Sequence, residues 1–570
     1  MRPAALLALS LLALAASSPA IPQAAPAASA APVNLTVDLS HSLGPVRVQR
    51  WFGYDEENYT SAPNGRKLLH ELDDLSPTPV SIRFHHLLTS GNGTPELKWS
   101  STGVYREGPD GKPIYNFAIL DRIFDALQAA GVRPMVEFGF MPEDLAATLP
   151  NHPNQPYKVP FPRNVTAGAS NNPPRDYAKW RELVRVLTAH FVQRYGRAAV
   201  LQWYFEVWNE PDISYWHGSE QDYFRLYDFT VSGVRAALPG ARVGGPATTG
   251  PSGSHAAEYL RGFLEHLASG HSDVDGKPIP LDFISFHAKG HPAFQEGHVV
   301  MGIRHELDDA DQGFAIIQRF PRFRTLPVIL SEADPEGCAA CSARNNPANN
   351  YRNGTLYPAY TAAAYSALTD LAARHHTHLI AMLTWAFEFE NTDAFEGFRS
   401  LATDGIDKPI LNFFRMAGLL GSERVAATST AATSLDDLLH AGVAQGEDID
   451  AFATRTDRSA AILVWNYQES ATAGPTAPTT LSLRHLPPSA TRVLVTQYRI
   501  DGTHSNAYTV WQAMGSPAHP TPEQLTQLES RDGLELLTSP AWHAPSHGVL
   551  TLKMDLPVES VALVTARWTP

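Results

Sequence analysis

The chain has 570 residues, of which 44% are hydrophobic and 18% charged, with a formal net charge of −14. This length exceeds one ordinary domain, and the composition excludes a chain that is disordered throughout. The acidic balance without a basic cluster argues against nucleic acid as a main partner, and two cysteines exclude a disulfide-built scaffold or a cysteine-rich metal site.

The N-terminus has the pattern of a secretory signal peptide. Arg2 supplies a positive charge, residues 4–16 are apolar, and the small residues 17–20 suit cleavage. We therefore expect a signal peptide at 1–20, an Ala/Pro-rich leader at 21–32, and a secreted or periplasmic protein without a membrane segment after cleavage. An uncleaved anchor is the alternative, although the apolar stretch is short of the ~20 residues that span a bilayer.

From residue 46 to residue 421, short apolar runs alternate with amphipathic helical patterns. The expected strands are Val46–Phe52, Val80–Leu88, Val132–Met141, Leu201–Asn209, Arg242–Ala247, Leu281–His287, Pro327–Glu332 and Leu379–Phe387. The expected helices include Phe117–Ala130, Asp176–Tyr195, Gln221–Leu238, Ala256–Ala268 and Tyr357–His375. Eight such units predict an α/β fold, a (β/α)₈ barrel that forms a catalytic domain over residues 33–421. An open doubly wound sheet is the alternative, but no glycine-rich phosphate loop follows the first strand.

After Gly421 the helical periodicity fades. Short alternating runs follow, separated by Pro and Gly, at Ala460–Trp465, Leu481–Leu486, Arg492–Arg499, Gly548–Met554 and Val561–Thr565. They predict an antiparallel β-sandwich domain over residues 422–570. The run Val33–Leu39 alternates as well and could pair with this sandwich as one of its strands.

Two glutamates end the fourth and the seventh expected strands. Glu210 lies in a Trp-Asn-Glu-Pro motif, and Glu332 lies in a Ser-Glu-Ala-Asp-Pro motif. Side chains at the C-terminal ends of barrel strands meet at one rim, so we expect the two carboxyl groups to lie together. Such a pair can hydrolyse a glycoside, one group as acid and the other as nucleophile or base, whereas a single glutamate at a strand end is more often a solvated loop residue.

The motif around Glu210 is similar to that of retaining glycosidases that carry two catalytic glutamates on a (β/α)₈ barrel. Within that clan the sequence resembles glycoside hydrolase family 39, which holds β-xylosidases and α-L-iduronidases. The resemblance covers nearly everything after the leader, including residues 498–508. It implies that Glu210 is the general acid/base, that Glu332 is the nucleophile and that Asn209 contacts the sugar 2-hydroxyl. The implied enzyme removes a terminal sugar from an oligo- or polysaccharide.

Three further residues take substrate-site roles by this resemblance. Arg83 on the second strand would hydrogen-bond the nucleophile and keep it ionised, and an ion pair with Glu206 inside the barrel is an alternative that can coexist with that role. His85 matches a substrate-binding histidine of the iduronidases, and Trp385 matches the tryptophan under the cleaved sugar. A rim histidine without a ligand and a plain core tryptophan are the alternatives.

The end of the sixth strand bears on the substrate. Lys289 follows His287, as in iduronidases, whereas xylosidases of the family usually carry a tyrosine in place of the lysine. With Arg399, Lys289 could bind a carboxylate at sugar C5, or it could form a structural salt bridge. Without a carboxylate partner the two cations indicate a uronide. Pairing with Asp393, which stands one position from the matching iduronidase aspartate, or with Glu396 indicates a xylose- or arabinose-like sugar.

Cys338 and Cys341 form a C-x-x-C motif after the seventh strand. For an exported protein we interpret it as a local disulfide, because two thiols make half of a zinc site and the context of a redox motif is absent. No metal and no cofactor are expected, since both H-x-x-x-H pairs are flanked or split by Gly or Pro. The rival function is an inactive carbohydrate-binding protein on a barrel scaffold. The sequence predicts no oligomeric state.

Overall fold

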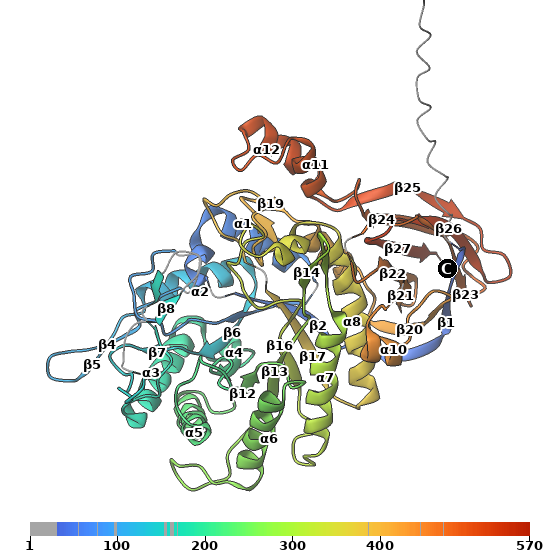
Figure 1. Ribbon diagram of the computed structural model, residues 1–570. Coiled ribbons are helices and arrows are strands. Elements are labelled where there is room, and N and C mark those ends of the chain that lie inside the picture. Colours follow the sequence, from blue (N-terminus) through green and yellow to red (C-terminus); the bar gives the residue numbers. More distant parts are fainter. Residues whose placement is uncertain are drawn as a thin grey trace, which may run out of the picture.

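The computed structural model describes residues 31–569 except 55, 77, 96–99, 153–156, 160–164, 168, 386, 445 and 471. The expected signal peptide and most of the leader lie outside the described residues. Within these residues, no helix has the length and apolar character to span a bilayer. The chain forms a closed parallel barrel and a nine-stranded, largely antiparallel sheet (Figure 1). The predicted fold class, a (β/α)₈ barrel with a β-sandwich, is confirmed.

Eight parallel strands close the barrel in chain order. They are β2 (Gln49–Tyr54), β3 (Ser81–Phe84), β6 (Arg133–Phe138), β11 (Tyr204–Val207), β12 (Arg242–Thr248), β13 (Phe283–Lys289), β16 (Val328–Asp334) and β17 (Leu379–Trp385). All eight overlap the strands predicted from the sequence. Helices cover the outside and side chains fill the inside, so the strands are buried on both faces and their sequences are nearly continuous apolar runs.

Each barrel strand is followed by a helix that packs on the outside of the barrel (Figure 1). The helices are α1 (Pro63–Asp74), α2 (Ala118–Ala130), α3 (Tyr177–Tyr195), α5 (Glu220–Ala237), α6 (Ser254–Ser269), α7 (Ile303–Gln318), α8 (Leu356–Arg374) and α9 (Pro409–Gly418). Asp176 caps α3, because its side chain accepts the N–H groups of Ala178 and Lys179, and Gly196 follows the last turn. The sequence predicts both ends of this helix.

Short elements decorate the loops of the barrel. They are the helix α4 (Arg197–Val200), two 3₁₀ turns (Glu57–Ser61 and Pro347–Asn353), and the strand pairs β4 (Tyr105–Glu107) with β5 (Pro113–Tyr115), β7 (Met141–Pro142) with β10 (Ala169–Ser170), β8 (Tyr157–Val159) with β9 (Val165–Ala167), β14 (Ala293–Gln295) with β15 (His298–Val300), and β18 (Ala402–Thr403) with β19 (Ile406–Asp407). Most of them lie in segments that follow barrel strands, where loops can vary without disturbing the core.

The second sheet has the order β25-β24-β27-β22-β21-β20-β1-β23-β26. Its strands are β1 (Val33–Pro45), β20 (Glu423–Ser429), β21 (Asp448–Arg455), β22 (Ser459–Tyr467), β23 (Ala477–Arg484), β24 (Val493–Ile500), β25 (Glu535–His543), β26 (Leu550–Leu556) and β27 (Ser560–Trp568). Apolar residues from both halves of the sheet, such as Leu481 and Val564, share one buried cluster. The sheet therefore folds over on itself as a sandwich.

Strand β1 joins the two ends of the chain. It pairs antiparallel with β20 and parallel with β23 (Figure 1). The expected purely antiparallel sheet thus contains one parallel pair, because a strand from the N-terminus enters between two strands of the C-terminal domain. Helices α10 (Leu435–Ala441), α11 (Ala507–Ala513) and α12 (Pro522–Glu529) are further parts of this domain, and α11 packs on Phe395 in the loop after β17.

We expect Asp176→Ala to lower the free energy of unfolding by about 1 kcal/mol, because two N–H groups in the first turn of α3 lose their acceptor. Urea unfolding followed by circular dichroism measures this loss. Asp176→Asn keeps a capping oxygen and is the matched control. Equal stability of Asp176→Ala and the unchanged chain would contradict the capping role.

Candidate active site

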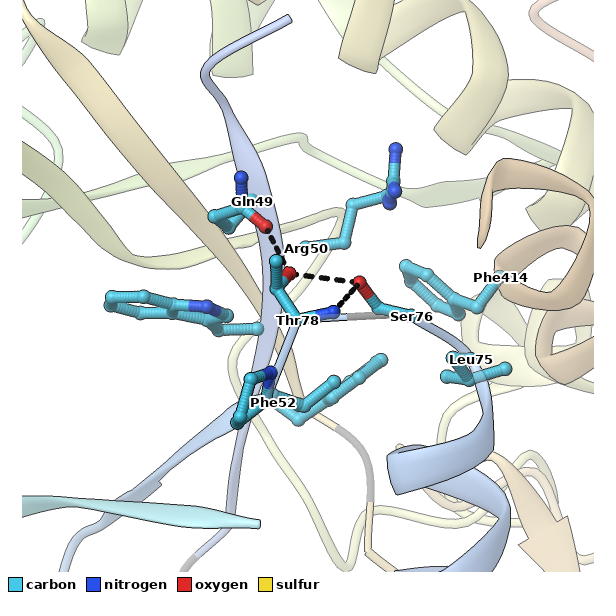
Figure 2. Close-up of a pocket in the computed structure, with 10 residues that line it drawn as sticks. Gln49, Arg50, Phe52, Leu75, Ser76, Thr78 and Phe414 are labelled. Carbon is cyan, nitrogen blue, oxygen red and sulfur yellow. Dashed lines mark hydrogen bonds between the residues drawn. The ribbon is translucent and has the colours of Figure 1, made fainter. Parts of the chain in front are cut away.

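The C-terminal ends of the barrel strands bring most of the predicted site residues together. The charged and aromatic side chains there are Arg83 from β3, Glu137 from β6, Glu206 from β11, His287 and Lys289 from β13, Glu332 and Asp334 from β16, and Trp385 from β17. The pocket in Figure 2 lies at the opposite end of the barrel, between the start of β2 at Gln49 and Arg50, the loop with Ser76 and Thr78, and Phe414 of α9. None of the predicted site residues lines that pocket.

Asn209 and Glu210 both reach the site, although neighbours on a regular strand point to opposite faces. Strand β11 ends at Val207, and the chain then leaves the extended conformation, with φ angles of 68° at Trp208 and 46° at Glu210. Residues other than glycine seldom adopt such angles, and those that do cluster at functional sites. The turn brings both side chains to the same rim.

Arg83 is fully buried inside the barrel and contacts three carboxyl groups. Its Nε donates to Glu206 Oε2 at 2.5 Å, and its Nη2 lies 2.7 Å from Glu137 Oε2. Its Nη1 donates to Glu332 Oε1 at 3.3 Å, and Nη2 donates to Asn209 Oδ1 at 2.8 Å. The expected contact with Glu332 and the alternative ion pair with Glu206 therefore exist together.

The contact with Arg83 orients the amide of Asn209. Since Oδ1 accepts from Arg83, the amide nitrogen Nδ2 points the other way, where it is buried without a hydrogen-bond partner in the described part of the chain. A buried donor without a partner is unfavourable, and such groups in native proteins are usually satisfied by water or a ligand. Nδ2 is thus available to an oxygen atom of a bound molecule.

Lys289 and Arg399 both bind Glu332 and Asp334. Lys289 Nζ donates to Glu332 Oε2 at 2.8 Å and to Asp334 Oδ1 at 2.6 Å. Arg399 Nη2 donates to Glu332 Oε2 at 3.1 Å, and Arg399 Nε donates to Asp334 Oδ2 at 2.7 Å. The predicted set of site residues lacked Asp334. The alternation of side chains along β16 could have revealed it, because residues two apart on a strand share a face.

Asp393 and Glu396, the partners that the sequence suggested for the two cations, do not fill that role. Both carboxylates instead accept from Nη2 of Arg344, at 2.6 Å and 2.9 Å. This part of the prediction is wrong, because the aspartate of β16 already neutralises Lys289 and Arg399 from inside the barrel. The carboxylate that pairs with the two cations thus lies on strand β16 and not in the loop after β17.

The surrounding cations keep Glu332 ionised. Burial raises the pKa of the Glu332 carboxyl, but Lys289, His287 and Arg399 outweigh this effect and hold the pKa well below its ordinary range. For Asp334, burial also raises the pKa, and Arg399 and Lys289 again lower it below the ordinary value. Both groups are therefore carboxylates near neutral pH.

The pKa of Glu137 is shifted in the opposite direction. Burial raises its pKa well above the ordinary value, although the charge of Arg83 opposes the change. Three cations face three further carboxyl groups of the cluster, namely Arg83, Lys289 and Arg399 against Glu206, Glu332 and Asp334. Each of these cations thus has a carboxyl partner without any ligand.

His287 lies between the two glutamates. Its Nδ1 is 2.9 Å from Glu210 Oε1, and its Nε2 is 3.9 Å from Glu332 Oε1. The Glu210 side chain is 17% exposed and the Glu332 side chain 5%, so Glu210 is the more open to solvent. Cations hold Glu332 as an anion, and Glu210 can exchange protons with solvent or a ligand.

Trp385 packs beside the guanidinium groups of the site. The Cζ atom of Arg399 lies 4.8 Å from the ring centroid, and the Cζ atom of Arg83 lies 5.9 Å from it. The ring of His85 stands edge-on to the indole at 5.6 Å. Gly53 at the end region of β2 makes room for the ring, because a Cβ atom there would lie 2.7 Å from Trp385 Cζ3.

The loop after β16 supports Arg399 from the side away from Glu332. Cys338 and Cys341 form the expected disulfide in this loop. Arg399 Nη1 donates to the carbonyl oxygen of Gly337 at 2.8 Å, and the backbone N–H of Arg399 donates to the carbonyl oxygen of Ala339 at 2.9 Å.

Lys408 is a second support that the sequence did not reveal. Its Nζ is buried and donates to the carbonyl oxygen of Phe398 at 3.0 Å and to Ser400 Oγ at 3.1 Å, the residues on either side of Arg399. Burial lowers the pKa of the Lys408 ammonium to about 7. A lysine in a loop is usually solvated, so no pattern in the sequence marked this one.

The carboxylates of the site are engaged with nitrogen cations. Among the residues that the structure describes, no three His, Cys, Asp or Glu side chains are grouped so as to hold a metal ion. The chemistry available to these residues is proton transfer and nucleophilic attack by a carboxylate.

The comparisons with known proteins find similar sequences over most of the chain. The model described as "Glycosyl hydrolases family 39" matches residues 96–544. A β-xylosidase of Geobacillus stearothermophilus is 30% identical over 86% of this chain and 88% of its own length. The α-L-iduronidase of Homo sapiens is 28% identical over 68% of this chain, and the match spans 59% of the human protein.

Solved structures show the same fold. A monomeric β-xylosidase from Caulobacter crescentus CB15 has a TM-score of 0.72 at 22% identity, with 94% of this chain and all of that chain covered. A bacterial orthologue of human α-L-iduronidase has a TM-score of 0.74 at 20% identity, with 94% and 84% covered. At these identities the likeness concerns the arrangement of the barrel and the sandwich.

We expect Gly53→Ala to lower the free energy of unfolding by about 1–3 kcal/mol, because the new methyl group would collide with the buried ring of Trp385. Urea unfolding and the near-ultraviolet circular dichroism of the tryptophans measure the change. Gly502→Ala is the matched control, since no atom lies within 4 Å of the Cβ position there. Indistinguishable unfolding of the two variants would contradict this packing.

Proposed function

The chain belongs to glycosyl hydrolase family 39, and we propose that this glycosidase works with retention, with Glu332 as nucleophile and Glu210 as general acid/base. One observation carries the proposal: the two glutamates flank a single imidazole, and their environments differ. Glu332 is buried among cations that favour its anion, and Glu210 is partly exposed to solvent. Family membership sets aside the inactive carbohydrate-binding scaffold.

In the first step, a carboxylate oxygen of Glu332 attacks the anomeric carbon while Glu210 donates its proton to the leaving oxygen. The bond between the sugar and the leaving group breaks, and a glycosyl ester of Glu332 forms. Arg83, Lys289 and Arg399 favour the carboxylate over the carboxylic acid, so the attacking group is present as an anion.

In the second step, Glu210 removes a proton from water, and the resulting hydroxide attacks the same anomeric carbon. The ester bond breaks, Glu332 leaves as a carboxylate, and the sugar is released with its original configuration. The free Nδ2 of Asn209 is the donor that we assign to the sugar 2-hydroxyl. The indole of Trp385 offers an apolar surface to the sugar ring.

The sugar that we propose is uncharged, with a terminal β-D-xylosyl group as the leading candidate. Lys289 and Arg399 already have carboxylate partners, and a further carboxylate from the substrate would have no buried cation to balance it. The β-xylosidase of Geobacillus stearothermophilus, which this chain matches over most of both lengths, supports the same choice.

An α-L-iduronide is the second candidate, and one observation favours it. Lys289 has three N–H donors, two of which bind carboxylates, and its side chain is 18% exposed. The remaining donor could reach a carboxylate at sugar C5. Because the two sugars share their configuration from C1 to C4, the same pair of glutamates could serve both.

We also propose that the chain is exported. The signal-like residues 1–20 and the disulfide between Cys338 and Cys341 support this, since disulfides persist in oxidising compartments. N-terminal sequencing of the mature protein tests the proposal. A mature chain that begins after residue 20 supports export, and a cytoplasmic protein that keeps Met1 contradicts it.

We expect Glu332→Ala to abolish turnover of every aryl glycoside, because no glycosyl ester can form. Glu210→Ala should lower kcat/KM by about 10²–10⁴-fold on phenyl xyloside. The loss of kcat/KM should be much smaller on dinitrophenyl xyloside, because its leaving group needs little protonation. Steady-state kinetics with both substrates measure the difference. Added azide should accelerate turnover by Glu210→Ala and give the glycosyl azide of retained configuration. If azide instead rescued Glu332→Ala with retention, the assignment of the two roles would be the wrong way round.

For the substrate, we expect the unchanged chain to hydrolyse an aryl β-D-xyloside with a higher kcat/KM than an aryl α-L-iduronide. Lys289→Met should lower both values by a similar factor, since the lysine then serves the nucleophile and not the substrate. Parallel kinetics on both substrates test this, with Lys277→Met, an exposed lysine, as control. A loss of about 10²-fold or more on the iduronide alone would identify a uronide enzyme.

A further inference from the structure

The guanidinium of Arg399 is held from two sides. Its Nε and Nη2 donate to Asp334 and Glu332, and its Nη1 donates to the carbonyl oxygen of Gly337. The backbone N–H of Arg399 donates to Ala339 of the same turn. Two nitrogen atoms of Arg399, Nε and Nη2, thus bind the carboxylates. The other two, Nη1 and the backbone nitrogen, bind residues 337–341, which we name the disulfide turn.

The disulfide turn is fixed by a covalent bond and by its neighbours. The bond between Cys338 and Cys341 closes it, and the N–H of Cys338 donates to the carboxylate of Glu336 at 3.0 Å. The carbonyl oxygen of Cys341 accepts from Asn349 Nδ2 at 2.8 Å and from Arg352 Nη1 at 3.3 Å. Hydrogen bonds hold the two ends of the turn, and the disulfide closes the loop that carries the carbonyl group of Ala339 and that begins directly after Gly337.

A shift of the carbonyl groups of Gly337 and Ala339 would affect Glu332 through Arg399. Hydrogen bonds weaken with small changes of distance and angle, and the ion pairs of Arg399 lie in a buried site where charge interactions are strong. Since Arg399 lowers the pKa of Glu332, a displaced guanidinium would leave Glu332 with a higher pKa and a smaller anionic fraction.

We propose that the disulfide turn is a positioning element for Arg399 and that, through Arg399, it keeps the nucleophile Glu332 in its reactive state. The inference rests on the proposed function, because it takes the role of Glu332 from there. Cys338 and Cys341 touch neither Glu332 nor Glu210 in the described contacts, so their effect passes through Arg399.

The double variant Cys338→Ser/Cys341→Ser removes the bond and keeps side chains of similar size. We expect kcat/KM to fall by about 10- to 100-fold, as for other small misplacements near a reacting centre. We also expect the acidic limb of the pH profile of kcat/KM to move to higher pH, since the nucleophile must be ionised and its pKa has risen. A lower melting temperature with an unchanged kcat/KM per active site and an unchanged acidic limb would overturn the proposal.

A double-mutant cycle with Arg399→Met tests the path of the effect. If the turn acts through Arg399, the serine substitutions should cause little further loss of kcat/KM in the Arg399→Met background. If the two losses simply multiply, the turn acts independently of Arg399 and the proposal fails.

Reduction of the unchanged protein gives a second test that does not depend on the folding of a variant. Dithiothreitol passes two electrons and two protons to the disulfide, its own sulfur atoms join as a cyclic disulfide, and Cys338 and Cys341 become thiols. The chain has two cysteines, so a thiol count of two reports this bond. We expect kcat/KM to fall as two thiols appear and to recover on reoxidation.

A protein with two free thiols, unchanged kcat/KM and an unchanged acidic limb would overturn the inference and leave the proposed function intact. A fully oxidised, unchanged chain without retaining glycosidase activity would instead contradict the proposed function. The two failures are therefore distinguishable.

Discussion

Three cations at the C-terminal end of the barrel require carboxylates to neutralise them, and most other features of the site depend on this requirement. An unpaired buried charge costs several kcal/mol, so Arg83, Lys289 and Arg399 each have carboxyl partners. The cations come from β3, β13 and the loop after β17, and these carboxyl partners come from β11 and β16, so the pairs form when the barrel is closed. The same pairs hold Glu332 as an anion, which is the form that a nucleophile needs.

The difference between the two glutamates follows from where each lies in this arrangement. Glu332 lies near the end of a buried strand and shares its cations with Asp334, whereas Glu210 follows the end of β11, where the backbone leaves the extended conformation. His287 contacts Glu210 directly and lies near Glu332, so one side chain separates the anion from the proton donor. These ion pairs also bear on substrate choice, because cations that already have carboxylate partners suit an uncharged sugar.

The sequence predicts those features that depend on local periodicity or on a single strand end. The eight barrel strands, the capped helix α3 and the glutamate pair belong to this group. Pairings between distant segments do not follow from periodicity. For this reason Asp393 was expected as the partner of Lys289 and Arg399, a role that Asp334 has in the structure. Strand β25 was missed because six of its nine residues are exposed and none is buried, so its sequence lacks an alternating pattern. The sequence did not predict the role of the buried Lys408 for a related reason, since its burial depends on the fold around it.

The most direct test of this account is the pH dependence of covalent labelling. A 2-fluoro dinitrophenyl glycoside of whichever sugar the protein hydrolyses fastest needs no proton from Glu210, so its rate of inactivation reports the ionisation of the nucleophile alone. The account predicts that mass spectrometry finds the label on Glu332 and that the inactivation rate stays constant to well below pH 4.5, the ordinary pKa of a glutamate. A label on another carboxylate, or a rate that falls with a midpoint at or above pH 4.5, would contradict it.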